Sequence, residues 1–141
     1  MKDGFIKVAA VTPKIRVADP EYNRKKIMEK IEEAEKERAV VVVFPELCIT
    51  GYTCGDLFFQ EPLLEEAQEA LIQLAKDTAG KNMLVFVGLP VAYRGKLYNV
   101  AAALSNGVIL GMVPKQCIPA YNEFYEARYF EEGMEEPVDV I

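Results

Sequence analysis

Three charged residues stand just past the ends of apolar runs, where side chains can do chemistry. Glu46 follows the run Val-Val-Val-Phe-Pro, Lys115 follows Gly-Met-Val-Pro, and Glu126 lies in the loop segment 121–126. Ligand sites of α/β proteins commonly form at such strand ends. A carboxylate beside a lysine can accept a proton at neutral pH, while the ammonium stabilises negative charge that develops on a substrate oxygen. Each residue by itself is also compatible with a surface charge or a structural ion pair.

What this acid–lysine set lacks is a nucleophile, because amide cleavage through an acyl-enzyme requires a thiol activated by an adjacent base. The sequence contains no histidine, which excludes a Ser-His-Asp site, a Cys-His site and His-ligated zinc within this chain. Cys48 lies two residues after Glu46. Cys117 lies two residues after Lys115. We interpret both thiols as small buried residues and Cys54 as a more exposed loop thiol.

Composition limits the class of protein. A chain of 141 residues with 51% hydrophobic residues is long enough for one domain with its own core. The net charge of −6 argues against a nucleic-acid partner, which would need clustered Lys and Arg. Residues 1–5 do not resemble a signal peptide, and the longest apolar run, 39–44, is too short to cross a bilayer. We therefore expect a soluble, cytoplasmic protein with no membrane partner.

Apolar runs predict the strands that must position these side chains. Residues 5–11, 39–44 and 83–89 each read as a buried strand. The second run is rich in β-branched residues without interruption, which indicates burial on both faces. Residues 97–104 and 108–113 flank an Asn-Gly pair, the signal of a β-hairpin.

Helix signals separate the first three strands. Asp19 can cap a first helix whose first turn suits Pro20, and apolar residues then recur at spacings of three and four. A second helix runs from Pro62 to Gly80. The order predicts a mixed β-sheet with helices on one face, and because the other face must be buried somewhere, we expect an incomplete domain. Three further glycines are assigned to strand ends and turns: Gly88, Gly95 and Gly111.

Several segments resemble a known family. Residues 44–47 (FPEL), 113–115 (VPK) and 126–133 are similar to the nitrilase, or carbon–nitrogen hydrolase, superfamily. More narrowly, residues 45–58 (PELCITGYTCGDLF) and 119–130 (PAYNEFYEARYF) resemble the glutaminase domains of glutamine-dependent NAD synthetases. The similarity covers nearly the whole chain in the expected order.

The resemblance implies roles for five residues. Glu46 matches the general base of the family, and Lys115 matches the lysine that stabilises the oxyanion. Glu126 matches a second glutamate that helps to arrange the site. Tyr52 and Tyr121 fall in loops that border the glutamine pocket of the family, where they either contact substrate or pack the two loops together.

The resemblance also implies an incomplete nitrilase-like α-β-β-α sandwich, in which residues 1–141 form the N-terminal part of a glutaminase domain. The nucleophilic cysteine is expected beyond Ile141, so the 141 residues alone are predicted to lack glutaminase activity. In the full-length enzyme, glutamine hydrolysis would supply ammonia to a synthetase domain of the same polypeptide, which uses ATP and magnesium to make NAD. No cofactor or metal is expected in the glutaminase part, and the family commonly forms homo-oligomers.

Two other functions remain open at this stage. The chain could belong to another nitrilase-type amidase or carbamoylase, which a substrate panel would distinguish from a glutaminase. It could also be a non-catalytic α/β interaction module, for which Glu46→Gln would leave the biological role intact.

Overall fold

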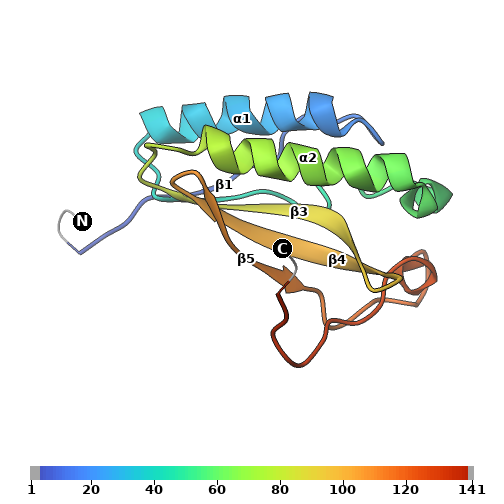
Figure 1. Cartoon of the computed structure of the whole chain (residues 1–141). Coiled ribbons are helices and arrows are strands. Elements are labelled where there is room, and N and C mark those ends of the chain that lie inside the picture. The colour runs from blue at the N-terminus through green and yellow to red at the C-terminus, as the bar shows by residue number, and fades with distance from the viewer. Residues whose placement is uncertain (1–3, 140–141) are drawn as a thin grey trace.

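The computed structural model describes residues 4–139, which form one five-stranded β-sheet with two helices on one of its faces (Figure 1). The sheet order equals the chain order: β1 (Val8–Ala10), β2 (Val41–Val43), β3 (Leu84–Tyr93), β4 (Lys96–Ser105) and β5 (Val108–Pro114). The first three strands pair in parallel and the last three pair antiparallel. The predicted mixed sheet is therefore confirmed.

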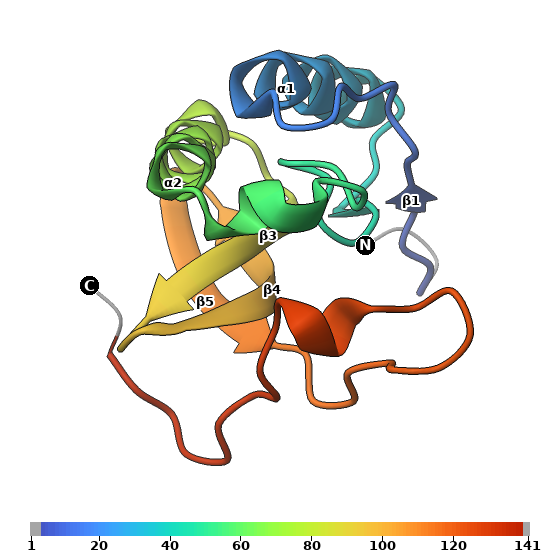
Figure 2. The ribbon, with the colours of Figure 1, turned by 90° about the vertical axis from the view of Figure 1, so that its right-hand side faces the viewer.

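The two helices lie side by side over the sheet, as Figure 2 shows from the end of the molecule: α1 (Pro20–Lys36) and α2 (Glu61–Asp77). The backbone N–H of Tyr22 donates to the side chain of Asp19 at 3.0 Å, which confirms the predicted cap. Both helices turn their apolar side towards the sheet, and the core between the layers includes Ile27, Ile31, Ala67, Leu71, Leu74, Val42, Val85 and Leu104. The two predicted helices, and their place on one face of the sheet, are confirmed.

The predicted burial of the first strand is wrong, and the burial predicted for both faces of the second strand is found on one face only. Phe5 is 82% exposed, and Val8 in β1 is also exposed. In β2, Val42 is fully buried under the helices, whereas its neighbour Val43 is 45% exposed on the opposite face. Side chains of a strand alternate between two faces, and the helices cover only one of them. A run of valines therefore did not indicate two covered faces.

Two hairpins build the antiparallel half of the sheet. The predicted turn between β4 and β5 is present, with Asn106 and Gly107 both at positive φ. A second turn at Arg94 and Gly95 joins β3 to β4, so β3 continues past the predicted end at residue 89. The strand continues because Pro90 pairs opposite β4 instead of ending the ladder.

No helix within residues 4–139 is long and apolar enough to cross a membrane. The prediction that the chain lacks a signal peptide rests partly on residues 1–3, which lie outside the described residues.

Candidate functional site

The ammonium of Lys115 bridges the two glutamates that sequence analysis singled out. Its Nζ donates to Oε1 of Glu46 at 2.8 Å, and to Oε1 and Oε2 of Glu126 at 3.0 and 2.9 Å. The three residues come from the end of β2, the end of β5 and a short 3₁₀-helix (Glu126–Arg128). The predicted meeting of Glu46 with Lys115 is confirmed.

A close backbone approach positions Glu46. The chain leaves β2 and folds back onto β3, where the backbone N–H of Ile49 donates to the carbonyl of Gly88 at 3.1 Å. A Cβ atom at residue 88 would lie only 2.4 Å from the backbone nitrogen of Leu47. Gly88 therefore stands in the middle of β3 because the loop carrying Glu46 needs the space, and its assignment to a strand end or turn was wrong.

Two backbone hydrogen bonds position Lys115 just beyond β5. Its N–H donates to the carbonyl of Asn99 at 2.8 Å, and its own carbonyl accepts from the N–H of Gly133 at 2.9 Å. A Cβ atom at residue 133 would come within 2.9 Å of the ring of Pro114. Lys115 is thus held between β4 and the segment that follows Glu126.

Aromatic packing positions Glu126. Phe58, in the 3₁₀-helix Gly55–Phe59, lies with its ring centroid 5.6 Å from that of Tyr129 and 5.0 Å from that of Phe130. Arg128 donates two hydrogen bonds to the carboxylate of Asp56, at 3.0 and 3.2 Å. These contacts join the loop after Glu46 to the segment around Glu126. They hold Glu126 at 5% exposure, with its carboxylate against Lys115.

Two neutral side chains complete the hydrogen bonding of the glutamates. The hydroxyl of Tyr52 donates to Oε1 of Glu126 at 2.8 Å. The side-chain amide of Asn99 donates to Oε1 of Glu46, and to Oε2 of Glu126 at 3.5 Å. Sequence reasoning missed Asn99. The available signal was a single polar residue inside the apolar run 97–104, because a buried polar side chain in a strand needs a partner.

Tyr121 lies apart from this cluster in the contacts that the structure describes. Its side chain is 64% exposed and packs edge-on against Phe124, with ring centroids 5.6 Å apart. A contact between Tyr121 and substrate stays a prediction.

The electrostatics of the cluster favour the charged lysine. Burial by itself lowers the pKa of Lys115, but hydrogen bonds to Glu46 and Glu126 outweigh it, so the pKa lies above its usual value. Burial raises the pKa of the Tyr52 hydroxyl, and its hydrogen bond to Glu126 raises that pKa further. The site therefore presents an ammonium and a neutral phenol at physiological pH.

Glu46 keeps one oxygen available. Both of its hydrogen bonds, from Lys115 and from Asn99, go to Oε1. Among the donors of residues 4–139, none reaches Oε2. The side chain is also 41% exposed, whereas Glu126 is buried. Of the two carboxylates, Glu46 is the one that can receive a proton from a group outside the cluster.

The positions of the three cysteines differ in part from expectation. Cys48 is buried, as predicted, and burial raises the pKa of its thiol to about 11. Cys54 is also buried, against prediction, because its Sγ donates to the carbonyl of Thr50 at 3.2 Å beneath the loop. Cys117 is exposed, also against prediction, because it lies in the loop that leaves β5.

A cavity of about 580 Å³ opens beside Glu46 and Lys115 on the sheet face that the helices leave free. Its walls are mostly apolar and include Val43, Phe86, Gly88 and Val113, whereas Asn99, Glu46 and Lys115 supply polar groups. No cysteine is among the described residues that line it. An amide held here would meet a proton acceptor and a cation together.

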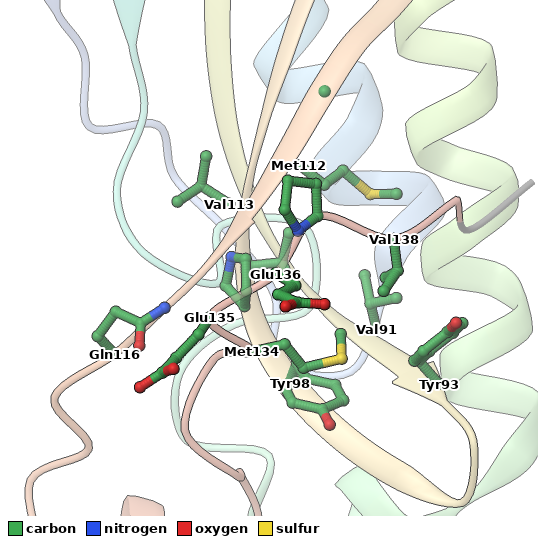
Figure 3. Close-up of a pocket in the computed structure, with 14 residues that line it drawn as sticks. Val91, Tyr93, Tyr98, Met112, Val113, Gln116, Met134, Glu135, Glu136 and Val138 are labelled. Atoms are coloured by element: carbon green, nitrogen blue, oxygen red, sulfur yellow. The ribbon is translucent and has the colours of Figure 1, made fainter.

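A second cavity, of about 430 Å³, lies between the ends of the antiparallel strands and the segment 134–138 (Figure 3). Its lining is mainly apolar and includes Val91, Tyr98, Met112 and Met134.

Within residues 4–139, no group of three or more Cys, Asp or Glu side chains is arranged to hold a metal ion.

Comparison with known proteins finds similar sequences among glutamine-dependent NAD(+) synthetases. The enzyme of Mycobacterium tuberculosis (strain H37Rv) is 35% identical over 130 residues, which are 92% of this chain and 19% of that protein. The enzyme of Aquifex aeolicus is 39% identical over 122 residues, 86% of this chain and 21% of that protein. The chain thus spans about a fifth of the length of the curated relatives that it matches.

Solved structures show the same fold. A glutamine-dependent NAD(+) synthetase from Cytophaga hutchinsonii superposes with a TM-score of 0.85 at 33% identity, covering 90% of this chain and 22% of that one. An amidase from Nesterenkonia sp. gives a TM-score of 0.77 at 20% identity, covering 98% of this chain and 52% of that one, a likeness of fold alone. The predicted nitrilase-like α/β fold is confirmed.

The family model for carbon-nitrogen hydrolases matches residues 7–141. The match therefore includes all five strands, both helices and the cluster of Glu46, Lys115 and Glu126. This chain belongs to the carbon–nitrogen hydrolase family.

Proposed function

We propose that this chain supplies the glutamate–lysine part of a glutaminase site, which releases ammonia from glutamine for ATP-dependent NAD synthesis. The observation that carries the proposal is the ammonium of Lys115 held between Glu46 and Glu126, while no donor within residues 4–139 reaches Oε2 of Glu46. The similarity to glutamine-dependent NAD(+) synthetases supports glutamine as the amide. In this proposal residues 1–141 are the N-terminal part of the glutaminase domain.

The nucleophile is a cysteine thiol from outside these 141 residues. Two of the three thiols present are buried, and none lines the cavity beside Glu46 and Lys115 among the described residues. The incoming thiol would approach from the open side of the sheet and transfer its proton to Oε2 of Glu46. The thiolate then attacks the side-chain amide carbon of glutamine, and the carbonyl π electrons move onto oxygen.

Lys115 stabilises the oxyanion of the tetrahedral intermediate, because its ammonium stays charged next to two carboxylates. Glu46 returns its proton to the amide nitrogen, the C–N bond breaks, and ammonia leaves. Glu46 then takes a proton from water, whose oxygen attacks the thioester carbon. The C–S bond breaks, glutamate is released, and the departing thiolate takes the proton from Glu46.

Glu126 acts through Lys115 in this scheme. It is buried, and both of its oxygens accept from the ammonium, so it holds the lysine without competing for the thiol proton. The hydroxyl of Tyr52 also donates to Glu126, and in this proposal its loop borders the substrate pocket. Tyr121 would join that pocket when substrate is bound.

The remaining steps of the proposal lie outside the glutaminase part. Ammonia would pass to a synthetase domain of the same polypeptide, where ATP and magnesium activate the acceptor for NAD synthesis. The names of the relatives, which include both glutamine and NAD(+), support this partner. The glutaminase chemistry itself needs only side chains and water.

We further propose a cytoplasmic homo-oligomer. All three cysteines are free and two are buried, a usage that suits a reducing compartment. Exposed apolar side chains that do not line the cavity beside Glu46 and Lys115, such as Phe59 and Leu110, are available for association. Light scattering of the purified full-length protein measures the assembly, and cell fractionation measures the location.

The decisive experiment is the substitution Glu46→Gln in the full-length protein. Because an amide cannot take the thiol proton, we expect glutamate release from glutamine to fall about 10³-fold with KM little changed. Glu33→Gln, an exposed carboxylate of α1, is the matched control. Synthesis of NAD from free ammonia should survive Glu46→Gln, because that step does not use this site. Equal glutaminase rates in the two variants would refute the proposal. Faster hydrolysis of another amide in a substrate panel would show that glutamine is not the preferred substrate.

A further inference from the structure

Asn99 contacts every charged member of the candidate site. Its side-chain nitrogen donates to Glu46 and, at 3.5 Å, to Glu126, while its backbone carbonyl accepts the N–H of Lys115 at 2.8 Å. The side chain is only 4% exposed, so at this position the hydrogen bonds to the two carboxylates come from the protein and not from bulk water. Asn99 is thus placed to control the geometry of the cluster from within the sheet.

The charge of the cluster explains why an amide stands here. Two carboxylates surround one ammonium, so their mutual repulsion is not fully compensated. The two N–H groups of one amide can serve two acceptors, and the carboxamide oxygen cannot replace them because it would face two carboxylates. The amide holds both glutamates without adding a charge that would compete with Lys115.

The sheet fixes the direction of this side chain. Asn99 lies in the middle of β4, in register with Pro90 of β3, and the next residue, Val100, is in register with Pro114 of β5. The carbonyl of Asn99 points to the β5 side, where it accepts from Lys115. Pro90, which has no N–H to donate, is therefore tolerated opposite Asn99 in β3. The pairing of β4 with both neighbouring strands leaves the Asn99 side chain little freedom to turn away from the two glutamates.

We propose that Asn99 is a positioning residue that holds Glu46 and Glu126 on either side of Lys115 and turns Oε1 of Glu46 inward, so that Oε2 faces the incoming thiol. The consequence for rate rests on the proposed glutaminase function. The consequence for the protonation of the cluster follows from the contacts alone.

Two substitutions in the full-length protein separate this role from simple packing. Asn99→Asp keeps the shape but replaces two donors with a third negative charge, and Asn99→Leu keeps approximately the volume and removes the donors. We expect each to lower kcat about 10²-fold with KM within about twofold, because the proton acceptor is misplaced while the pocket remains. We also expect the acid limb of the pH–rate profile to move up by about one pH unit, more for Asp than for Leu.

Asn23 provides the matched control. It is fully buried and makes three hydrogen bonds to backbone groups of Arg16 and Ile49, away from the charged cluster. Asn23→Asp should lower the thermal midpoint and leave the acid limb in place. If the Asn99 variants lose activity only in proportion to their thermal midpoints, as Asn23→Asp does, the positioning role is refuted.

A second readout does not depend on turnover. Carboxyl ¹³C resonances of the cluster, followed against pH in the same proteins, should show that the cluster in Asn99→Asp retains a proton to a pH about one unit higher than in the parent. Unchanged carboxyl titration would overturn the proposal even if the rates fell. A shifted titration in a protein without glutaminase activity would support Asn99 and count against the proposed function.

Discussion

The Nζ atom of Lys115 lies 2.8 Å from Oε1 of Glu46, although the two residues are 69 positions apart in the chain. The contact forms because Glu46 leaves the end of the parallel strand β2 and Lys115 leaves the end of the antiparallel strand β5 at the same part of the sheet. Between them, β3 carries Gly88, whose missing side chain leaves room for the loop with Glu46. The next strand, β4, carries Asn99, whose carbonyl holds the backbone N–H of Lys115.

Substitution of Gly88 tests the close approach. Gly88→Ala should reduce glutaminase activity of the full-length protein by about 10²-fold and lower stability by about 2 kcal/mol, because the new Cβ displaces the loop that carries Glu46. Gly111→Ala on β5 is the control, since nothing lies within 4 Å of its Cβ position. Kinetics and urea unfolding measure both effects. Similar results for the two variants would show that the close approach of the Glu46 loop to Gly88 matters neither for activity nor for stability.

Removal of the ammonium tests its bond to the buried glutamate. Lys115→Met should abolish activity and lower the free energy of unfolding by about 2 kcal/mol, because Glu126 loses its cation while remaining buried. Adding Glu126→Gln should restore about 1 kcal/mol of that loss, since a neutral amide tolerates burial, and activity should stay lost.

An exposed lysine serves as the reference for that experiment. Lys96 is half-exposed and pairs with Glu131 at 3.5 Å, so Lys96→Met should change stability by less than about 0.5 kcal/mol. A cost for Lys115→Met no larger than this, measured by denaturant unfolding, would contradict the inferred strength of the central ion pair.

Stability at alkaline pH should fall partly through Tyr52 and Lys115. Both pKa values are raised in the folded state above their ordinary values of 10.0 and 10.5, so the fold binds these protons more tightly than the unfolded chain. Their contribution is fully present below about pH 10 and is lost as pH rises through the folded-state pKa values. Tyr52→Phe should therefore flatten the decline of unfolding free energy above about pH 10. Tyr125→Phe, at an exposed ring, should leave the decline unchanged.

The three cysteines of this chain should be dispensable for chemistry. Replacing Cys48, Cys54 and Cys117 together by Ala in the full-length protein should preserve glutaminase activity within about threefold, because burial keeps the Cys48 and Cys54 thiols protonated and none of the three lines the cavity beside Lys115. For the same reason, residues 1–141 assayed alone should release no glutamate from glutamine. Loss of activity in the triple variant with an unchanged thermal midpoint would place the nucleophile among these thiols.

Local signals in the sequence determined most of the elements and the chemistry-bearing residue types. The cap at Asp19, the helical spacing that follows it and the Asn106–Gly107 turn all depend on contacts between near neighbours, so they could be read directly. Glu46, Lys115 and Glu126 could be named from the motifs that resemble the family, and the meeting of Glu46 with Lys115 could be predicted from their positions past strand ends.

Tertiary structure alone decided which faces are covered and which distant residues support the site. The exposure of Val43 depends on which side of the sheet the helices pack. The burial of Cys54 depends on its loop turning back so that the thiol contacts the carbonyl of Thr50. Gly88 and Asn99 act through contacts with residues 16 to 53 positions away, so their neighbours in sequence carry little sign of their roles. Short-range preferences fix what each segment becomes, whereas the order and pairing of strands decide which side chains meet.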